Sequence, residues 1–204
     1  MKNIFLFYVG LIVVSFFSIS FAEDEAMKQN PETQQKAIFA MGCFWCGAAA
    51  FAGPDTNEKF PGIIDVSAGY TGGVSTNPTY PAHEGHQEAV EVVFNPETIS
   101  YEKLLEIFWR NVDPFDGNGQ FCDEGKTYTS TIYFKDDEQK KKALDSKKAV
   151  EKKLGKPIVT EIKHASPFYE AEEYHQDYKR KNPIRYRGYR WNCGRDKRLK
   201  EIWG

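Results

Sequence analysis

The feature that most constrains the fold of this chain is its division into short strand-like and helix-like segments by glycine and proline. An apolar run at 36–41 stops at Gly42, which predicts a strand. The segment 43–52 contains no breaker, which predicts a helix that ends before Gly53-Pro54. The same reasoning predicts strands at 62–68, 88–94, 129–134 and 158–162, and helices at 100–112 and 136–155.

The resulting order of elements, β-α-β-β-α-β-α-β, begins with the six elements of a split β-α-β unit. We therefore expect an α+β fold, a ferredoxin-like two-layer sandwich with a mixed sheet and helices on one face. The segment after Pro183 is aromatic and basic, and we expect it to form a long irregular C-terminal tail.

The N-terminus has the composition of an export signal. Lys2 gives a positive start, the run 4–17 is almost entirely apolar, and Ser20 and Ala22 place small residues where an export peptidase cleaves. We expect a periplasmic or secreted protein with no stable membrane association after cleavage, the alternative being an uncleaved membrane anchor. The predicted division is a signal peptide at 1–22, a flexible lead-in at 23–35 and a single catalytic domain at 36–204.

The near balance of charge limits the class of partner. The chain carries 27 basic and 29 acidic residues in 204, a formal net charge of -2. This balance gives no reason to expect a nucleic-acid partner. The four cysteines, Cys43, Cys46, Cys122 and Cys193, would meet an oxidising compartment after export, where all of them could be structural.

Cys43 is the strongest candidate for chemistry, because it lies where the first predicted strand passes into a helix. The first turn of a helix has unpaired N–H groups and a positive dipole end, which stabilise a thiolate nucleophile. Alternatively, Cys43 and Cys46 are ordinary buried cysteines or a thioredoxin-like C-x-x-C redox pair. No metal site is predicted, since Cys122 and Cys193 form no second C-x-x-C.

Two further positions carry groups suited to an active site. Tyr80 is held between Pro78 and Pro81 on a long loop, so its hydroxyl could be aimed at a ligand. Glu88 begins a strand with apolar neighbours, and burial there would keep its carboxyl protonated as a general acid. The plainer alternatives are a surface tyrosine and an exposed strand glutamate.

Together these motifs resemble the peptide methionine sulfoxide reductase A family. The resemblance covers nearly all of the chain after residue 36 and keeps the order of the family's segments. It is carried by GCFWC at 42–46, YTGG at 70–73, NPTY at 77–80, GHQEAVEVVF at 85–94, QFCDEGKTYTS at 120–130, AEEYHQDYKRKNP at 171–183 and CGRDKRLKEIWG at 193–204.

The resemblance implies a reaction and a role for each site residue. Cys43 attacks the sulfur of methionine S-sulfoxide, in oxidised proteins and possibly in the free amino acid, and becomes a sulfenic acid. Glu88 protonates the departing oxygen. The residues implied in substrate binding are Tyr80, Asp123 and Tyr128 for the oxygen and Phe44 and Trp45 for the methyl group.

The resemblance also implies how the enzyme is regenerated. A second thiol attacks the sulfenic acid, and a thioredoxin-like dithiol reduces the resulting disulfide, with no bound cofactor. The family often has its resolving cysteine in the C-terminal region, which favours Cys193. Cys46, one helical turn from Cys43, is the competitor. Many family members have glycine at the position of Cys46 and asparagine at that of Cys122.

Two other functions compete with the reductase. One is a dithiol–disulfide oxidoreductase that uses Cys43 and Cys46 and needs no acid at Glu88. The other is an exported scaffold or binding domain held together by two permanent disulfides.

Overall fold

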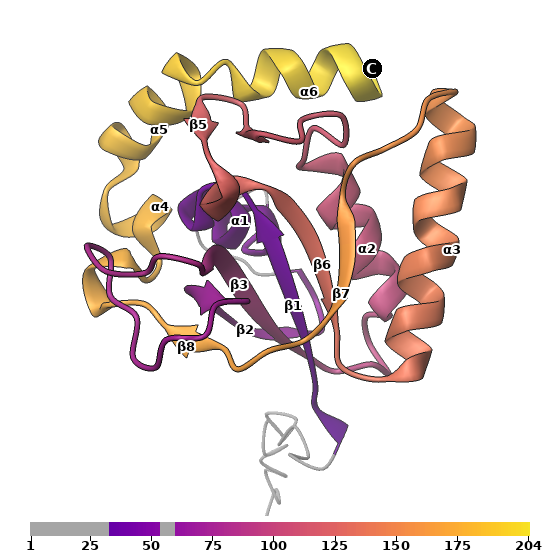
Figure 1. The fold of residues 1–204 in the computed structure, drawn as a ribbon, viewed down its shortest axis with the longest axis horizontal. Coiled ribbons are helices and arrows are strands. Elements are labelled where there is room, and N and C mark those ends of the chain that lie inside the picture. Colours follow the sequence, from indigo (N-terminus) through magenta and orange to yellow (C-terminus); the bar gives the residue numbers. More distant parts are fainter. Residues whose placement is uncertain (1–32, 54–59) are drawn as a thin grey trace, which may run out of the picture.

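A six-stranded mixed sheet forms the centre of the protein, as described by a computed structural model for residues 33–53 and 60–204 (Figure 1). The strand order is β7-β6-β1-β3-β2-β8. Strands β6 and β7 are parallel, and the other neighbours are antiparallel. The strands are β1 (Gln35–Met41), β2 (Ile63–Thr71), β3 (Gln87–Phe94), β6 (Ser130–Phe134), β7 (Glu161–His164) and β8 (Tyr169–Glu170), with a separate small hairpin of β4 (Gly119–Gln120) and β5 (Asp123–Glu124).

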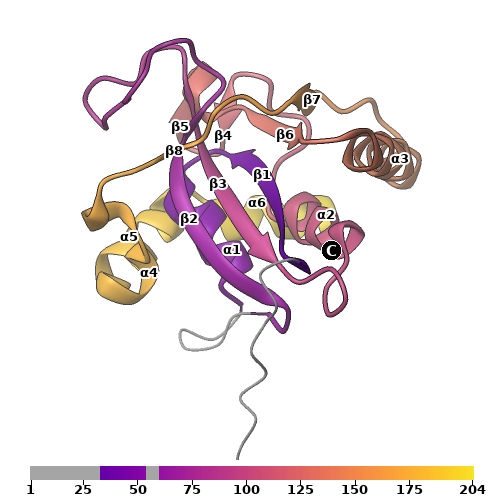
Figure 2. The ribbon, with the colours of Figure 1, turned by 90° about the horizontal axis from the view of Figure 1, so that it is seen from below.

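The helices complete an α+β architecture, as the sequence predicts. They are α1 (Phe44–Phe51), α2 (Tyr101–Arg110), α3 (Asp137–Leu154), α4 (Tyr178–Lys181), α5 (Pro183–Asn192) and α6 (Arg195–Trp203), with short 3-10 turns at Lys126–Tyr128 and Glu173–His175. Figure 2 shows α1, α2 and α6 gathered on one side of the central strands and α3 beside β6 and β7.

Strand β1 is buried on both faces. Phe39 points to the helical side, where its ring stacks on Phe51 at 5.2 Å and on Phe108 at 5.4 Å between centroids. Ile38 points to the opposite side, into a smaller cluster against which Phe168 packs. Because β1 is one of the two central strands and ends at Met41, the residues that follow it emerge close to the centre of the sheet.

Helix ends are set by the capping groups that the sequence indicates. The side chain of Ser100 accepts a hydrogen bond from the Lys103 amide at the start of α2. Asp136 accepts one from the Gln139 amide at the start of α3, and Gly155 ends that helix in the left-handed conformation.

The prediction of an irregular C-terminal tail is wrong. Residues after Pro183 form two helices, α5 and α6, joined at Gly194. Proline is compatible with the first turn of a helix, so Pro183 begins α5 and does not break it. The buried Arg195 fixes this region to the core, because it donates to the carbonyl oxygens of Met41 at 3.0 Å and Asn111 at 2.7 Å. Tertiary contacts thus determine structure that local pattern does not reveal.

The proposed signal peptide, 1–22, and most of the lead-in lie outside the described residues. Within 33–53 and 60–204, no helix has both the length and the apolar character needed to cross a membrane.

Candidate active site

Cys43 occupies the N-cap of α1, directly after a central strand. The chain turns at Gly42, which has a φ of +76° and where an added Cβ would lie 2.5 Å from Gln120 Cβ. The carbonyl oxygen of Cys43 accepts the amides of Cys46 at 3.0 Å and Gly47 at 3.1 Å. The residue is 6% exposed, so Cys43 lies just beneath the surface at the start of a helix. This is the strand-to-helix position that the sequence predicts.

Glu88 lies beside Cys43 and is buried, which excludes the exposed-strand alternative. Its side chain is on β3, 2% exposed, and Oε2 accepts the backbone N–H of Phe44 at 2.9 Å. Burial raises the pKa of Glu88 to about 8, although the Phe44 N–H opposes the shift. At neutral pH the carboxyl is therefore largely protonated, as a general acid requires.

The thiols of Cys43 and Cys46 influence each other's ionisation. Burial is the largest cause that raises the pKa of Cys43 well above its ordinary value. A hydrogen bond with Cys43, aided by the charges of Arg195 and Arg190, lowers the pKa of Cys46 to about 6 although burial opposes it. Burial therefore opposes, at Cys43, the thiolate that the helix end favours.

A cluster of aromatic rings surrounds Phe44 and Trp45. The Phe44 ring lies 4.8 Å from the ring of His175 and 6.3 Å from that of Tyr80, between centroids. The indole N–H of Trp45 donates to Nδ1 of His175 at 3.0 Å, and the indole stacks on Tyr178 at 3.7 Å. These contacts hold Trp45 in one orientation beside the thiol.

Tyr80 lies at the edge of this aromatic cluster. Its side chain is 40% exposed, and its amide donates to Glu172 Oε1 at 2.9 Å. The other carboxylate oxygen of Glu172 accepts the hydroxyl of Tyr70 at 3.1 Å. The loop predicted from its two prolines is thus fixed by a carboxylate from the C-terminal part of the chain.

Asp123 and Tyr128 complete the polar side of the site. Burial, followed by the charge of Glu88, raises the pKa of Tyr128, so its hydroxyl stays protonated. Burial also raises the pKa of Asp123, and the hydroxyl of Tyr189 donates to Asp123 Oδ2 at 2.5 Å. The structure therefore brings together all seven residues predicted for catalysis and substrate binding: Cys43, Phe44, Trp45, Tyr80, Glu88, Asp123 and Tyr128.

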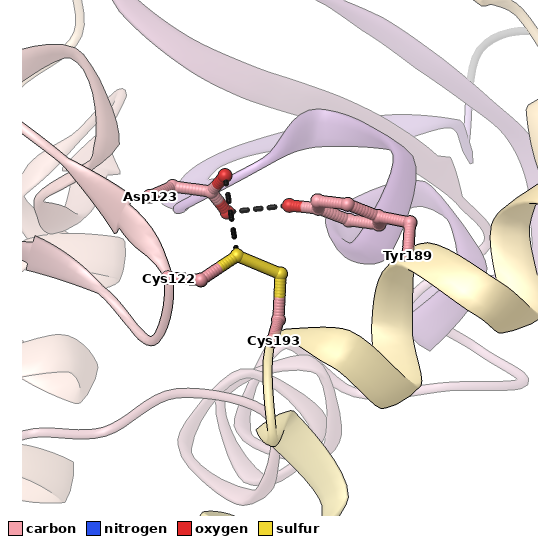
Figure 3. Close-up of a disulfide and its surroundings, with 4 residues drawn as sticks. All are labelled: Cys122, Asp123, Tyr189 and Cys193. Atoms are coloured by element: carbon pink, nitrogen blue, oxygen red, sulfur yellow. Dashed lines mark hydrogen bonds between the residues drawn. A yellow bond between two sulfur atoms is a disulfide. The ribbon is translucent and has the colours of Figure 1, made fainter.

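The two remaining cysteines are joined to each other. Cys122 and Cys193 form a disulfide with their Cα atoms 4.8 Å apart (Figure 3). Cys43 and Cys46 are free. The scaffold alternative required two bridges, whereas the structure has this one. Cys122, Asp123 and Cys193 place possible metal-ligand atoms close together, but both sulfurs are used by the disulfide.

Sequence reasoning missed four residues that build the site. Glu172 and His175 lie in the segment 171–183, which carried part of the family resemblance without a role for any residue. Tyr189 and Arg195 lie in the region expected to be irregular. A pattern of aromatic and basic residues gives no sign that their partners are 66 and 154 positions away.

Comparison with known proteins agrees with this site. The model of the family described as peptide methionine sulfoxide reductase matches residues 35–204. Peptide methionine sulfoxide reductase MsrA of Bacillus licheniformis is 46% identical over 183 residues, covering 85% of this chain and 96% of that protein. MsrA of Ligilactobacillus salivarius is 52% identical over 160 residues, covering 76% and 90%.

A solved structure shows the same fold. The crystal structure of Mxr1 from Saccharomyces cerevisiae in reduced form aligns with a TM-score of 0.69 at 29% identity, covering 78% of this chain and 92% of that chain. The family match spans the whole described domain and includes both the strand-to-helix cysteine and the buried glutamate. The chain belongs to the peptide methionine sulfoxide reductase family.

Proposed function

We propose that this protein reduces the S epimer of methionine sulfoxide in oxidised proteins, with the free amino acid as a second candidate substrate and Cys43 as the nucleophile. The observation that carries the proposal is the buried Glu88 carboxyl, which accepts the Phe44 amide beside Cys43 and whose pKa burial raises to about 8. A sulfoxide oxygen leaves badly as an anion, so the reaction needs a proton donor at this place.

The proposed chemical step moves two electrons from Cys43 to the substrate. The Cys43 thiolate attacks the sulfoxide sulfur and forms an S–S bond while Glu88 protonates the oxygen. The hydroxyl group then moves from the substrate sulfur to the Cys43 sulfur as the S–O and S–S bonds break, so methionine leaves and Cys43 becomes a sulfenic acid. The proton released when the Cys43 thiol ionises returns to the Glu88 carboxylate. Hydroxyl groups of Tyr80 and Tyr128, with Asp123, bind the oxygen as charge develops on it.

Selection of the epimer is assigned to the aromatic cluster. Phe44 is buried and Trp45 is fixed by its hydrogen bond to His175, so the two rings form a rigid apolar surface. A methyl group placed there, with the oxygen toward Glu88, leaves one arrangement of substituents around the sulfur. The opposite epimer would direct its oxygen toward the apolar rings, where it has no donor.

For regeneration, we assign the resolving role to Cys46 in preference to Cys193. The Cys46 thiol is hydrogen-bonded to Cys43 and has a lowered pKa, whereas Cys193 is bonded to Cys122. Attack of the Cys46 thiolate on the sulfenic acid releases water and forms a Cys43–Cys46 disulfide. A thioredoxin-like dithiol then reduces this bond. Mass-spectrometric mapping after one turnover should find Cys43–Cys46; a Cys43–Cys193 bond would contradict the assignment.

A dithiol–disulfide oxidoreductase is the second candidate function, because Cys46, three residues after Cys43, has the lowered pKa that thiol exchange uses. The two functions differ in their need for a proton donor. Substitution Glu88→Gln should abolish most sulfoxide reduction and leave the rate of thiol exchange nearly unchanged. Equal loss of both activities would favour the oxidoreductase.

The decisive assay compares the wild-type protein with Cys43→Ser on both epimers of methionine sulfoxide with a dithiol. Wild type should reduce the S epimer, and Cys43→Ser should be inactive. Reduction that survives Cys43→Ser, or a preference for the R epimer, would contradict the proposal. Trp191→Ala, at an exposed position of α5, is the control and should keep the wild-type activity.

We also propose that residues 1–22 direct export to the periplasm or the exterior and are removed, with an uncleaved anchor as the alternative. The composition of the segment supports this. N-terminal sequencing of the mature protein should start at Glu23; a start at Met1 would contradict cleavage.

For the fold, we infer a ferredoxin-like plan, supported by the order β6-β1-β3-β2 of the first four long strands.

A further inference from the structure

The Cys122–Cys193 disulfide connects the two segments that carry the Asp123–Tyr189 hydrogen bond. Asp123 is the next residue after Cys122, at the tip of the β4–β5 hairpin. Tyr189 lies one helical turn before Cys193, whose amide donates to the Tyr189 carbonyl oxygen at 3.0 Å. Figure 3 shows the bridge directly beside this pair.

Tyr189 reaches the reacting sulfur. Its hydroxyl donates to Asp123 and lies within hydrogen-bonding reach of the Cys43 sulfur. This second contact lowers the pKa of Cys43, against the raising effect of burial. The ring also meets Trp45 edge-on, 5.9 Å between centroids. Tyr189 therefore interacts with Asp123, with the Cys43 sulfur and with the Trp45 indole.

Packing alone holds this unit weakly. Of the ten residues of α5, all of them described, Tyr186 is buried, while Ile184 and Trp191 are each 79% exposed. The hairpin carries Phe121 at a φ of +64°, a backbone conformation that side chains disfavour. Arg195 holds both segments to the core through Met41, Asn111 and the Phe121 ring. The disulfide adds a direct covalent link between the two segments, at the residue before Asp123 and one helical turn after Tyr189.

We propose that the Cys122–Cys193 disulfide is a positioning element for the sulfoxide-reduction step, because it fixes the Tyr189 hydroxyl between Asp123 and the Cys43 sulfur. This inference rests on the proposed function. It differs from a role in regeneration, since it assigns the disulfide to the first half of the reaction, before any sulfenic acid is resolved. No electrons pass through the bridge in this step.

The test measures methionine formed in a single turnover, without reductant, by Cys122→Ser, Cys193→Ser and the double variant. Each should slow this step by the same factor, roughly tenfold, which is the effect of losing one hydrogen bond to a charged group. The alkylation of Cys43 by iodoacetamide, followed on its own peptide by mass spectrometry, should shift to higher pH. Trp191→Ala, on the exposed side of the same helix, is the matched control and should change neither quantity.

A second measurement uses the wild-type chain, in case the serine variants do not fold. Cys43 and Cys46 are already free, so mild reduction acts on the bridge alone and raises the number of free thiols from two to four. The reduced protein should show the same slower step and the same shift in Cys43 alkylation. Tyr189→Phe should reproduce both effects with the bridge intact, and adding Cys122→Ser to it should cause no further change.

Unchanged single-turnover rates and an unchanged alkylation profile, with loss of multiple turnover alone, would overturn the inference and assign the bridge to regeneration. Additive effects of Tyr189→Phe and Cys122→Ser would also overturn it, because the two would then act independently. Failure of the proposed function is distinguishable, since Cys43→Ser would then still reduce sulfoxide.

Discussion

At the scale of single residues, the site depends on how burial shifts two neighbouring acids in the same direction. Both Cys43 and Glu88 have their pKa raised mainly by desolvation. Burial therefore favours the neutral form of both groups. A protonated Glu88 places no negative charge beside the Cys43 thiol, so it does not oppose ionisation of the nucleophile.

The first prediction concerns the pH dependence of activity. Glu88 is the active acid when protonated and has a pKa of about 8, whereas Cys43 must lose its proton and has a raised pKa. Glu88→Gln keeps the ionisation of Cys43 but has no acid, so the ratio of wild-type to variant rates isolates the titration of Glu88. Below pH 8 the variant should be slower by about a hundredfold or more, the usual contribution of a general acid, and this difference should shrink as pH rises through 8. Single-turnover rates between about pH 6 and 9.5 test this, and a ratio that stays constant over that range would contradict the assignment.

The second prediction concerns stability at the same residue. The folded-state pKa of Glu88 is raised, so folding favours the protonated form, and stability is lost as pH rises from about 4.5 toward 8. Glu88→Gln removes this loss. The Tm of the variant minus the Tm of wild type should therefore increase between pH 5 and pH 8. Glu97→Gln, whose residue is exposed, is the control and should give a flat difference.

At the scale of elements, the junction of β1 and α1 positions the nucleophile through a turn that only glycine fits. The third prediction is that Gly42→Ala destabilises the protein by about 2 kcal/mol, because φ is +76° and the new Cβ would meet Gln120 Cβ. Urea denaturation measures this. Gly188→Ala, in α5 with no atom near the added Cβ, should instead stabilise by about 0.5–1 kcal/mol. The same sign for both would contradict the argument.

The same junction shows what sequence could and could not predict. The strand, the break at Gly42 and the helix follow from local pattern, so the place of Cys43 was predictable. The mixed sheet followed from the order of elements. The helices after Pro183 were not predictable, because their structure depends on the contacts of Arg195 with Met41 and Asn111. The preference for Cys193 could not foresee its bond to Cys122, since a pairing across 71 residues leaves no local trace.

At the scale of the whole molecule, Arg195 connects the C-terminal helices to the central strand β1 and to the end of α2. Its guanidinium also lies 4.3 Å from the centroid of the Phe121 ring, so it supports the hairpin that carries Asp123. Its charge contributes to the lowered pKa of Cys46. One buried cation therefore couples stability to the chemistry of the thiol pair.

The fourth prediction is that Arg195→Met lowers the free energy of unfolding by about 3 kcal/mol, because two buried carbonyl oxygens lose a charged donor. The pKa of Cys46 should rise above 6, as measured by alkylation of its peptide. Arg187→Met, at an exposed position of α5, should leave both values unchanged. A variant that is destabilised but keeps the wild-type alkylation profile of Cys46 would contradict the proposed effect of Arg195 on the pKa of that thiol.

The edge strands of the sheet limit how other chains can associate with the protein. The outermost strands, β7 and β8, are four and two residues long, and β7 carries the exposed charges Glu161 and Lys163. Little unpaired backbone is left for a foreign strand to extend. The edges of the sheet therefore offer few backbone groups with which an unfolded segment of another protein could pair.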